Sequence, residues 1–163
     1  MTDTGSRRLT DAVSIRDVRY GAGLLAVIVG GMHLLHPDLG LSRLLVYLEV
    51  GTLFDPRPAA FVASSVLFVC GPILVRRGRF VRSAYAAGIL LVLIHLLGYA
   101  AWHTVLDHGA FWPHLHGHAH HDVGALETIW IHLASDRVAL VTKLHELALL
   151  VALVVLFGKD TSR

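Results

Sequence analysis

The sequence predicts an all-α integral membrane protein in which four transmembrane helices form a bundle, with short interfacial helices on its outer side. Hydrophobic residues make up 55% of the 163 residues, and charged residues only 16%. The mean hydropathy is +0.62, and most charged residues stand between long apolar blocks. Such a chain has too few charges to solvate the surface of an ordinary globular domain. Four of the blocks approach the length of about 20 residues that a helix needs to cross a bilayer.

Four predicted spans divide the membrane domain, and helix-breaking residues separate the first two. In chain order the spans cover residues 20–36, 59–75, 83–105 and 138–157. Pro37 ends the first span because a proline cannot continue a helix. The stretch 55–58, Asp-Pro-Arg-Pro, precedes the second span. We therefore expect an N-terminal segment over 1–19, a membrane domain over 20–158 and a tail over 159–163.

Two shorter segments have the pattern of helices that lie in the membrane interface. Over 39–51, leucines recur at helical spacing, whereas Arg43 and Glu49 occupy other faces. A second segment, over 126–134, precedes the fourth span, and its Trp130 suits the level of the lipid headgroups. Neither segment is long enough to cross the bilayer alone.

Basic residues indicate the orientation of the chain. They concentrate in segment 1–19, in the loop 76–82 and in the tail, which lie on one side of the predicted bundle. Because cytoplasmic loops are enriched in Lys and Arg, we expect both termini in the cytoplasm and the protein in the plasma membrane. The net charge is +2, and because the basic residues lie mainly in these short segments, the sequence does not indicate nucleic-acid binding. The single Cys70 excludes an internal disulfide and a thiolate cluster.

Three histidines on three different spans fall at nearly the same predicted depth. At 1.5 Å per residue, His33 lies roughly 20 Å and His95 roughly 18 Å from the inner boundary. His145 lies about 10 Å below the outer boundary, hence about 20 Å from the inner face of a 30 Å core. An imidazole in hydrocarbon must find a partner or cost several kcal/mol. The matched depths therefore predict one cofactor or metal site formed by all three.

Further ligand-type groups lie near this level in the outer half of the predicted bundle. His36 and His103 lie about one turn further out, and Glu146 adjoins His145. A histidine near the interface can simply be hydrated, and Glu146 can instead pair with Lys143. Because the inner half is almost purely aliphatic, the pattern favours a localised site over a proton path across the membrane.

The loop over 107–122 combines histidines with Gly, Ala and Pro. Its candidate metal ligands are Asp107, His108, His114, His116, His118, His120 and His121. Dense imidazoles on a flexible segment can bind Zn²⁺, Cu²⁺ or Ni²⁺. The alternatives are a solvated loop that binds metal as any histidine tract does, or a lid that gains charge in acid.

This loop resembles the histidine-rich loops of zinc transporters of the cation diffusion facilitator and ZIP families. His103 and Asp107 form an HxxxD pair that is similar to the pair in the transport site of the former family. The likeness covers only these short stretches. Those families have more spans and a second such motif on another helix, whereas here the second pair, His118 and Asp122, lies in the loop.

Three classes of function fit these features. In the first, which the matched depths favour, the deep histidines hold copper, zinc or iron, or two of them hold a b-type haem that exchanges electrons with a quinone. In the second, the loop passes metal to the deep site, as in a small transporter, sensor or chaperone. In the third, the chain is a structural or assembly subunit of a larger membrane complex. The sequence has no HExxH, CxxC, GxSxG or nucleotide-binding glycine loop, so it assigns no reaction.

Overall fold

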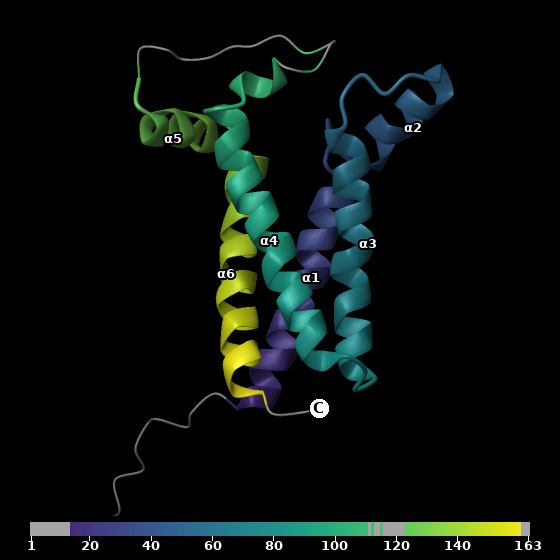
Figure 1. Cartoon of the computed structure of the whole chain (residues 1–163), viewed down its shortest axis with the longest axis vertical. Coiled ribbons are helices and arrows are strands. Elements are labelled where there is room, and N and C mark those ends of the chain that lie inside the picture. Colours follow the sequence, from purple (N-terminus) through teal and green to yellow (C-terminus); the bar gives the residue numbers. More distant parts are fainter. Residues whose placement is uncertain (1–13, 111, 113–114, 116–122, 161–163) are drawn as a thin grey trace, which may run out of the picture.

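The computed structural model describes residues 14–110, 112, 115 and 123–160, and every regular element in these ranges is helical. The elements are α1 (Ile15–Leu34), α2 (Leu41–Val50), α3 (Arg57–Arg76), α4 (Val81–His103), the 3-10 turn η1 (Asp107–Gly109), α5 (Ala125–Ser135) and α6 (Arg137–Lys159). Four long helices run along the molecule, and α2, η1 and α5 gather at one end, here called the loop end (Figure 1). At the opposite, terminal end α1 begins and α6 ends. The all-helical prediction is confirmed, and each of the six predicted helices is present.

Side-chain caps fix where two of the long helices begin. At the start of α1, the Ser14 hydroxyl accepts the backbone N–H of Asp17 at 3.1 Å, and the Asp17 carboxylate accepts the N–H of Ser14. At the start of α6, the Asp136 carboxylate accepts the N–H groups of Val138 and Ala139. Such caps satisfy backbone donors that have no partner within the helix.

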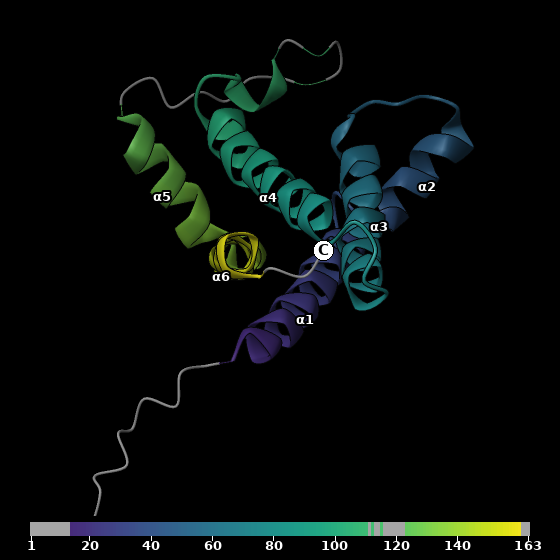
Figure 2. The same ribbon diagram turned by 60° about the horizontal axis from the view of Figure 1, so that its bottom comes forward.

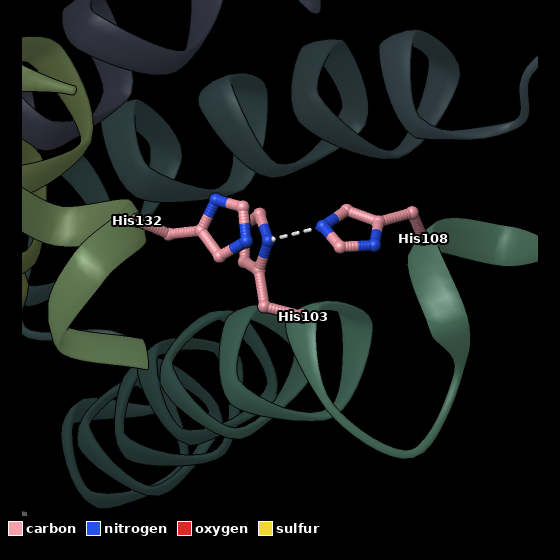
Figure 3. Close-up of side chains that lie close together, drawn as sticks. All are labelled: His103, His108 and His132. Carbon is pink, nitrogen blue, oxygen red and sulfur yellow. Dashed lines mark hydrogen bonds between the residues drawn. The ribbon is translucent and has the colours of Figure 1, made fainter. Parts of the chain in front are cut away.

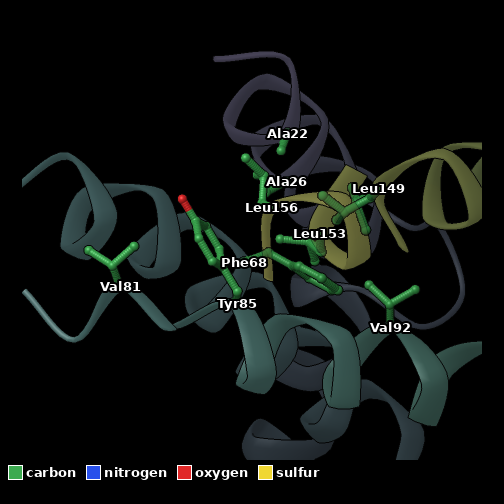
Figure 4. Packing of buried hydrophobic residues seen from close by; sticks show 10 residues of the cluster. Ala22, Ala26, Phe68, Val81, Tyr85, Val92, Leu149, Leu153 and Leu156 are labelled. Carbon is green, nitrogen blue, oxygen red and sulfur yellow. The ribbon is translucent and has the colours of Figure 1, made fainter. Parts of the chain in front are cut away.

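The four long helices form a ring in which α1 and α4 each pack against both α3 and α6 (Figure 2). The apolar core lies inside this ring (Figure 4), and its buried members include Val29, Phe68, Val92, Leu149 and Leu156. Gly30 allows α1 to approach α3 closely. A Cβ atom at this position would lie 3.1 Å from the carbonyl oxygen of Ser65 and 3.2 Å from Cβ of Phe68.

Three of the long helices, α3, α4 and α6, are long and apolar enough to cross a membrane. Their surfaces carry exposed apolar side chains such as Val66, Leu97 and Val151, as expected of a lipid-facing surface. Helix α1 has 20 residues but is not among the three, since charged residues occupy its first turns. The fourth span thus remains a prediction.

At the terminal end, one buried carboxylate joins three helices. Asp160, which directly follows α6, accepts hydrogen bonds from Nη2 of Arg19 on α1 and from the hydroxyl of Tyr85 on α4, both at 2.6 Å. The Asp160 side chain is 3% exposed. A residue expected in the tail is therefore part of the packed bundle.

Candidate metal centre

The deep centre consists of His33, His95 and Glu146, whose potential ligand atoms all lie within 4.8 Å of one another. The three residues come from α1, α4 and α6, so residues far apart in the sequence meet inside the ring of helices. The side chains of His33 and Glu146 are fully buried. His33 and Glu146 lie on the buried stripes of their helices, among residues that form the core.

The orientation of the His33 ring is fixed by its own helix. Nδ1 lies 2.8 Å from the carbonyl oxygen of Val29. Because a carbonyl only accepts hydrogen bonds, Nδ1 carries the proton and donates it. In the neutral ring Nε2 then presents a lone pair. This atom lies 3.1 Å from Nδ1 of His95 and 3.2 Å from Oε1 of Glu146.

The His95 ring is held from behind by α3. Its Nε2 lies 2.8 Å from the hydroxyl oxygen of Ser64, which can accept the Nε2 proton. In that arrangement Nδ1 of His95 also presents a lone pair toward His33. Two imidazole nitrogens and one carboxylate oxygen then face one another, which is repulsive unless a proton or a metal ion lies between them.

Lys143 and Glu146 form a buried ion pair one turn apart on α6. Nζ of Lys143 lies 2.8 Å from Oε2 and 3.0 Å from Oε1 of Glu146, and it also donates to the carbonyl oxygen of His95 at 3.2 Å. The alternative pairing of Glu146 expected from the sequence therefore occurs together with its contact to His33. The opposite charges reduce the cost of burying either group alone.

Aromatic rings enclose the deep centre. The rings of Phe61 and Phe68 lie 4.7 and 5.7 Å from the His33 ring and 5.5 and 6.0 Å from the His95 ring, measured between centroids. The centroids of the two imidazoles are 4.3 Å apart, and Nε2 of His33 lies 3.1 Å from Nδ1 of His95. Imidazoles in direct contact leave no space for a macrocycle between them. The arrangement therefore gives the haem alternative no support.

The structure does not bring His145 to this group. Its side chain is partly exposed on α6, and Nδ1 donates to the carbonyl oxygen of Val141 in its own helix at 2.8 Å. Adjacent residues of a helix point about 100° apart, so only one of His145 and Glu146 can face the bundle interior. The expected meeting of three imidazoles is corrected to two imidazoles and one carboxylate.

His36 also stays outside the deep centre, although it lies close by. Its Nδ1 accepts the backbone N–H groups of Asp38 and Leu39, both at 3.2 Å, and thereby closes the turn after α1. Its ring meets Phe61 edge-on with centroids 5.6 Å apart.

A second group, the loop-end centre, consists of His103, His108 and His132 (Figure 3). Nδ1 of His103 lies 3.0 Å from Nε2 of His108, and the rings of His103 and His132 stack with centroids 4.1 Å apart. His103 ends α4, His108 lies in η1 and His132 belongs to α5. Asp107 lies beside His108, at 3.9 Å, and is not a member of the group.

Sequence reasoning missed His132 because it treated the helix of 126–134 only as an interfacial element. The one available signal was that this helix carries a histidine directly after a histidine-rich loop. The remaining loop candidates, His114, His116, His118, His120 and His121, lie outside the described residues.

Two cavities differ in polarity along the bundle. A cavity of about 470 Å³ is lined by His33 and His95 of the deep centre and by His103 of the loop-end centre. A larger cavity of about 1030 Å³ lies toward the terminal end, and apolar side chains such as Leu91 and Leu153 form most of its wall. Polar groups thus cluster in the loop-end half of the bundle.

Comparisons with protein-family models, with curated proteins and with solved structures give no match for this chain.

Proposed function

We propose that this chain is a membrane-embedded protein that binds one transition-metal ion at the deep centre. A single observation carries the proposal. Nε2 of His33 faces Nδ1 of His95 at 3.1 Å and Oε1 of Glu146 at 3.2 Å, while the far nitrogen of each imidazole is hydrogen-bonded. Histidines that bind metals commonly have their second nitrogen fixed by a carbonyl or another polar group, which orients the ligand nitrogen.

The spacing of these atoms fits a small metal ion. Zinc binds imidazole nitrogen and carboxylate oxygen at about 2.0–2.2 Å, so ligands in a tetrahedral shell are separated by roughly 3.3 Å. The two measured separations, 3.1 and 3.2 Å, are close to that value. Two imidazoles and a carboxylate suit zinc, copper or iron, and they leave a further coordination position open.

The proposal includes a bundle of four membrane-crossing helices with α1 as the fourth. At 1.5 Å per residue the 20 residues of α1 span about 30 Å, the thickness of the hydrocarbon core. Arg16, Asp17 and Arg19 lie in its first turns, near the expected membrane surface. Since Arg76, Arg77 and other basic residues lie at the same end, we place the terminal end in the cytoplasm and the loop end outside the plasma membrane.

The test compares metal binding by detergent-purified variants. To remove adventitious binding, all variants carry alanine at the five loop positions 114, 116, 118, 120 and 121. Metal content after loading with Zn²⁺ is measured by mass spectrometry, and loading with Co²⁺ gives a visible absorption spectrum that reports coordination. The protein without further changes is the parent.

We expect His95→Ala and Glu146→Gln each to lose one equivalent of tightly bound metal relative to the parent. His145→Ala is the matched control, because it removes an imidazole that is outside the deep centre from the same helix as Glu146. If His95→Ala and Glu146→Gln retain the parent's metal content, the group is held together by a proton and the proposal is rejected.

A further inference from the structure

We propose that the loop-end centre is a second metal site, and that an ion reaches the deep centre from it through the 470 Å³ cavity. The proposal of a second site depends only on the geometry of the loop-end centre. The transfer step rests on the proposed function of the deep centre. With both the second site and the transfer step, the protein would take up its metal ion from the loop end.

The loop-end centre gathers three imidazoles from three elements. His103 lies between the other two: it is hydrogen-bonded to His108 at 3.0 Å and stacked on His132 at 4.1 Å, as Figure 3 shows. The rings of His108 and His132 have centroids 5.0 Å apart. Three neutral imidazoles form a ligand set that holds zinc and leaves a fourth position open for water or for transfer.

The backbone at the loop-end centre is strained where it turns to bring His108 to His103. Asp107 and His108 have φ angles of 43° and 54°, in the left-handed region that residues other than glycine rarely adopt. The turn brings the His108 imidazole back toward His103, five residues earlier. Backbone strain of this kind costs about 1–3 kcal/mol and is found preferentially at functional sites.

The two centres differ in their access to solvent. All three histidines of the loop-end centre are partly exposed, whereas His33 and Glu146 in the deep centre are fully buried. An ion from solution therefore meets the loop-end centre first. Ligand exchange there needs no opening of the bundle.

Polar side chains connect the two centres along the cavity. His95, Tyr99 and His103 lie on successive turns of α4, so they share one face and cover about 12 Å. All three line the cavity, as do Asp136, which caps the start of α6, and Lys143 within α6. The charged groups of the cavity wall are the carboxylates of Asp38 and Asp136 and the cations of Arg57 and Lys143, and the ligand groups of the deep centre lie further along it.

Lys143 is the group that an arriving cation must displace. Its ammonium occupies both oxygens of Glu146, and the same Nζ lies 5.2 Å from the centre of the Tyr99 ring, which can accept it by a cation–π contact. Toward the terminal end, the side chains that follow are those of the apolar core, such as Ala26, Phe68 and Leu149. Among the described residues, ligand-type side chains line the 470 Å³ cavity toward the loop end, whereas the wall of the 1030 Å³ cavity toward the terminal end is mostly apolar.

The experiment uses the same five-alanine parent and counts bound Co²⁺ at equilibrium. The parent is expected to bind two equivalents, His132→Ala one, and Glu146→Gln one. His108→Asn is a second variant against the loop-end centre, because asparagine tolerates a positive φ and preserves the turn while removing the imidazole. His145→Ala is again the control, and circular dichroism verifies that each variant is folded.

Rates distinguish the transfer step from binding alone. We expect the deep centre to fill more slowly in His132→Ala and His108→Asn than in the parent, as measured by stopped-flow absorption after mixing with Co²⁺. If both variants bind as much Co²⁺ as the parent, the second site is rejected. If they lose one equivalent but fill the deep centre at the parent's rate, the transfer step is rejected. If Glu146→Gln retains both equivalents, the proposed function fails, while the variants of His132 and His108 still decide the second site.

Discussion

Nε2 of His33 lies 3.2 Å from Oε1 of Glu146, so the first and last long helices meet through two fully buried polar side chains. Burial of this kind is costly unless each group has further partners. His33 has the carbonyl oxygen of Val29, and Glu146 has the ammonium of Lys143. The deep centre is therefore a network in which each side chain has a further polar partner. Substitutions at different members of this network should have different effects.

Removing the ammonium of Lys143 should destabilise the protein. In metal-free Lys143→Met the Glu146 carboxylate stays buried without its cation, and breaking a buried pair in this way costs about 3–5 kcal/mol. The free energy of unfolding in detergent measures the effect. Lys159→Met, at the exposed end of α6, is the control, and the double variant Lys143→Met/Glu146→Gln should recover part of the loss. Equal stability of Lys143→Met and the parent would contradict the ion pair.

Ser64→Ala should weaken metal binding at the deep centre without removing a ligand. The Ser64 hydroxyl holds Nε2 of His95 at 2.8 Å, and loss of such a supporting hydrogen bond lowers metal affinity about tenfold or more. Ser65→Ala is the matched control, because the Ser65 hydroxyl bonds to the carbonyl oxygen of Phe61 in its own helix. Competition with a chelating dye gives both affinities. Equal losses in the two variants would show that Ser64 has no special role.

Gly30→Ala should push α1 away from α3. The added methyl group would lie 3.1 Å from the carbonyl oxygen of Ser65 and 3.2 Å from Cβ of Phe68, and overpacking typically costs about 1–3 kcal/mol. Gly31→Ala is the control, since a Cβ at Gly31 meets nothing within 4 Å. Thermal unfolding followed by circular dichroism should show a lower midpoint for Gly30→Ala only. Because His33 lies one turn further along α1, the same variant should also bind metal less tightly.

Asp160→Asn should loosen the terminal end of the bundle. It removes the charge that accepts bonds from Arg19 and Tyr85 at 2.6 Å, and bonds to charged groups are worth about 1.5–3 kcal/mol. The control is Asp38→Asn, whose carboxylate is exposed and lies 3.7 Å from Arg43. Denaturant unfolding should show a clear loss of stability for Asp160→Asn and almost none for Asp38→Asn. Equal stability of the two variants would contradict a structural role for Asp160.

The sequence was sufficient to predict the helices, because the signals that define them are local. Long apolar blocks, Pro37 and the stretch 55–58 locate the ends of the four long helices to within five residues, the largest difference being at the start of α1, and leucine spacing finds α2. The depths of His33 and His95 follow from counting along each helix. These two residues indeed meet in the structure.

Which side chain faces the interior was decided only by tertiary packing. Helix α6 is apolar on nearly every side, so its sequence does not reveal its rotation about its own axis. In the structure the buried stripe runs through Glu146, Leu149, Leu153 and Leu156, which turns the neighbouring His145 outward. The choice between these adjacent ligands thus depends on how α6 packs against α1 and α4.

Local sequence signals likewise could not predict contacts between segments that are distant in the sequence. His132 joins His103 because α5 returns across the loop end to pack against α4 and α6. The sequence by itself determined the helical, apolar character of the chain and the supply of imidazoles in one half of it. The tertiary structure alone decided which imidazoles and carboxylates meet, because a meeting depends on the rotation and packing of helices and not on spacing along the chain.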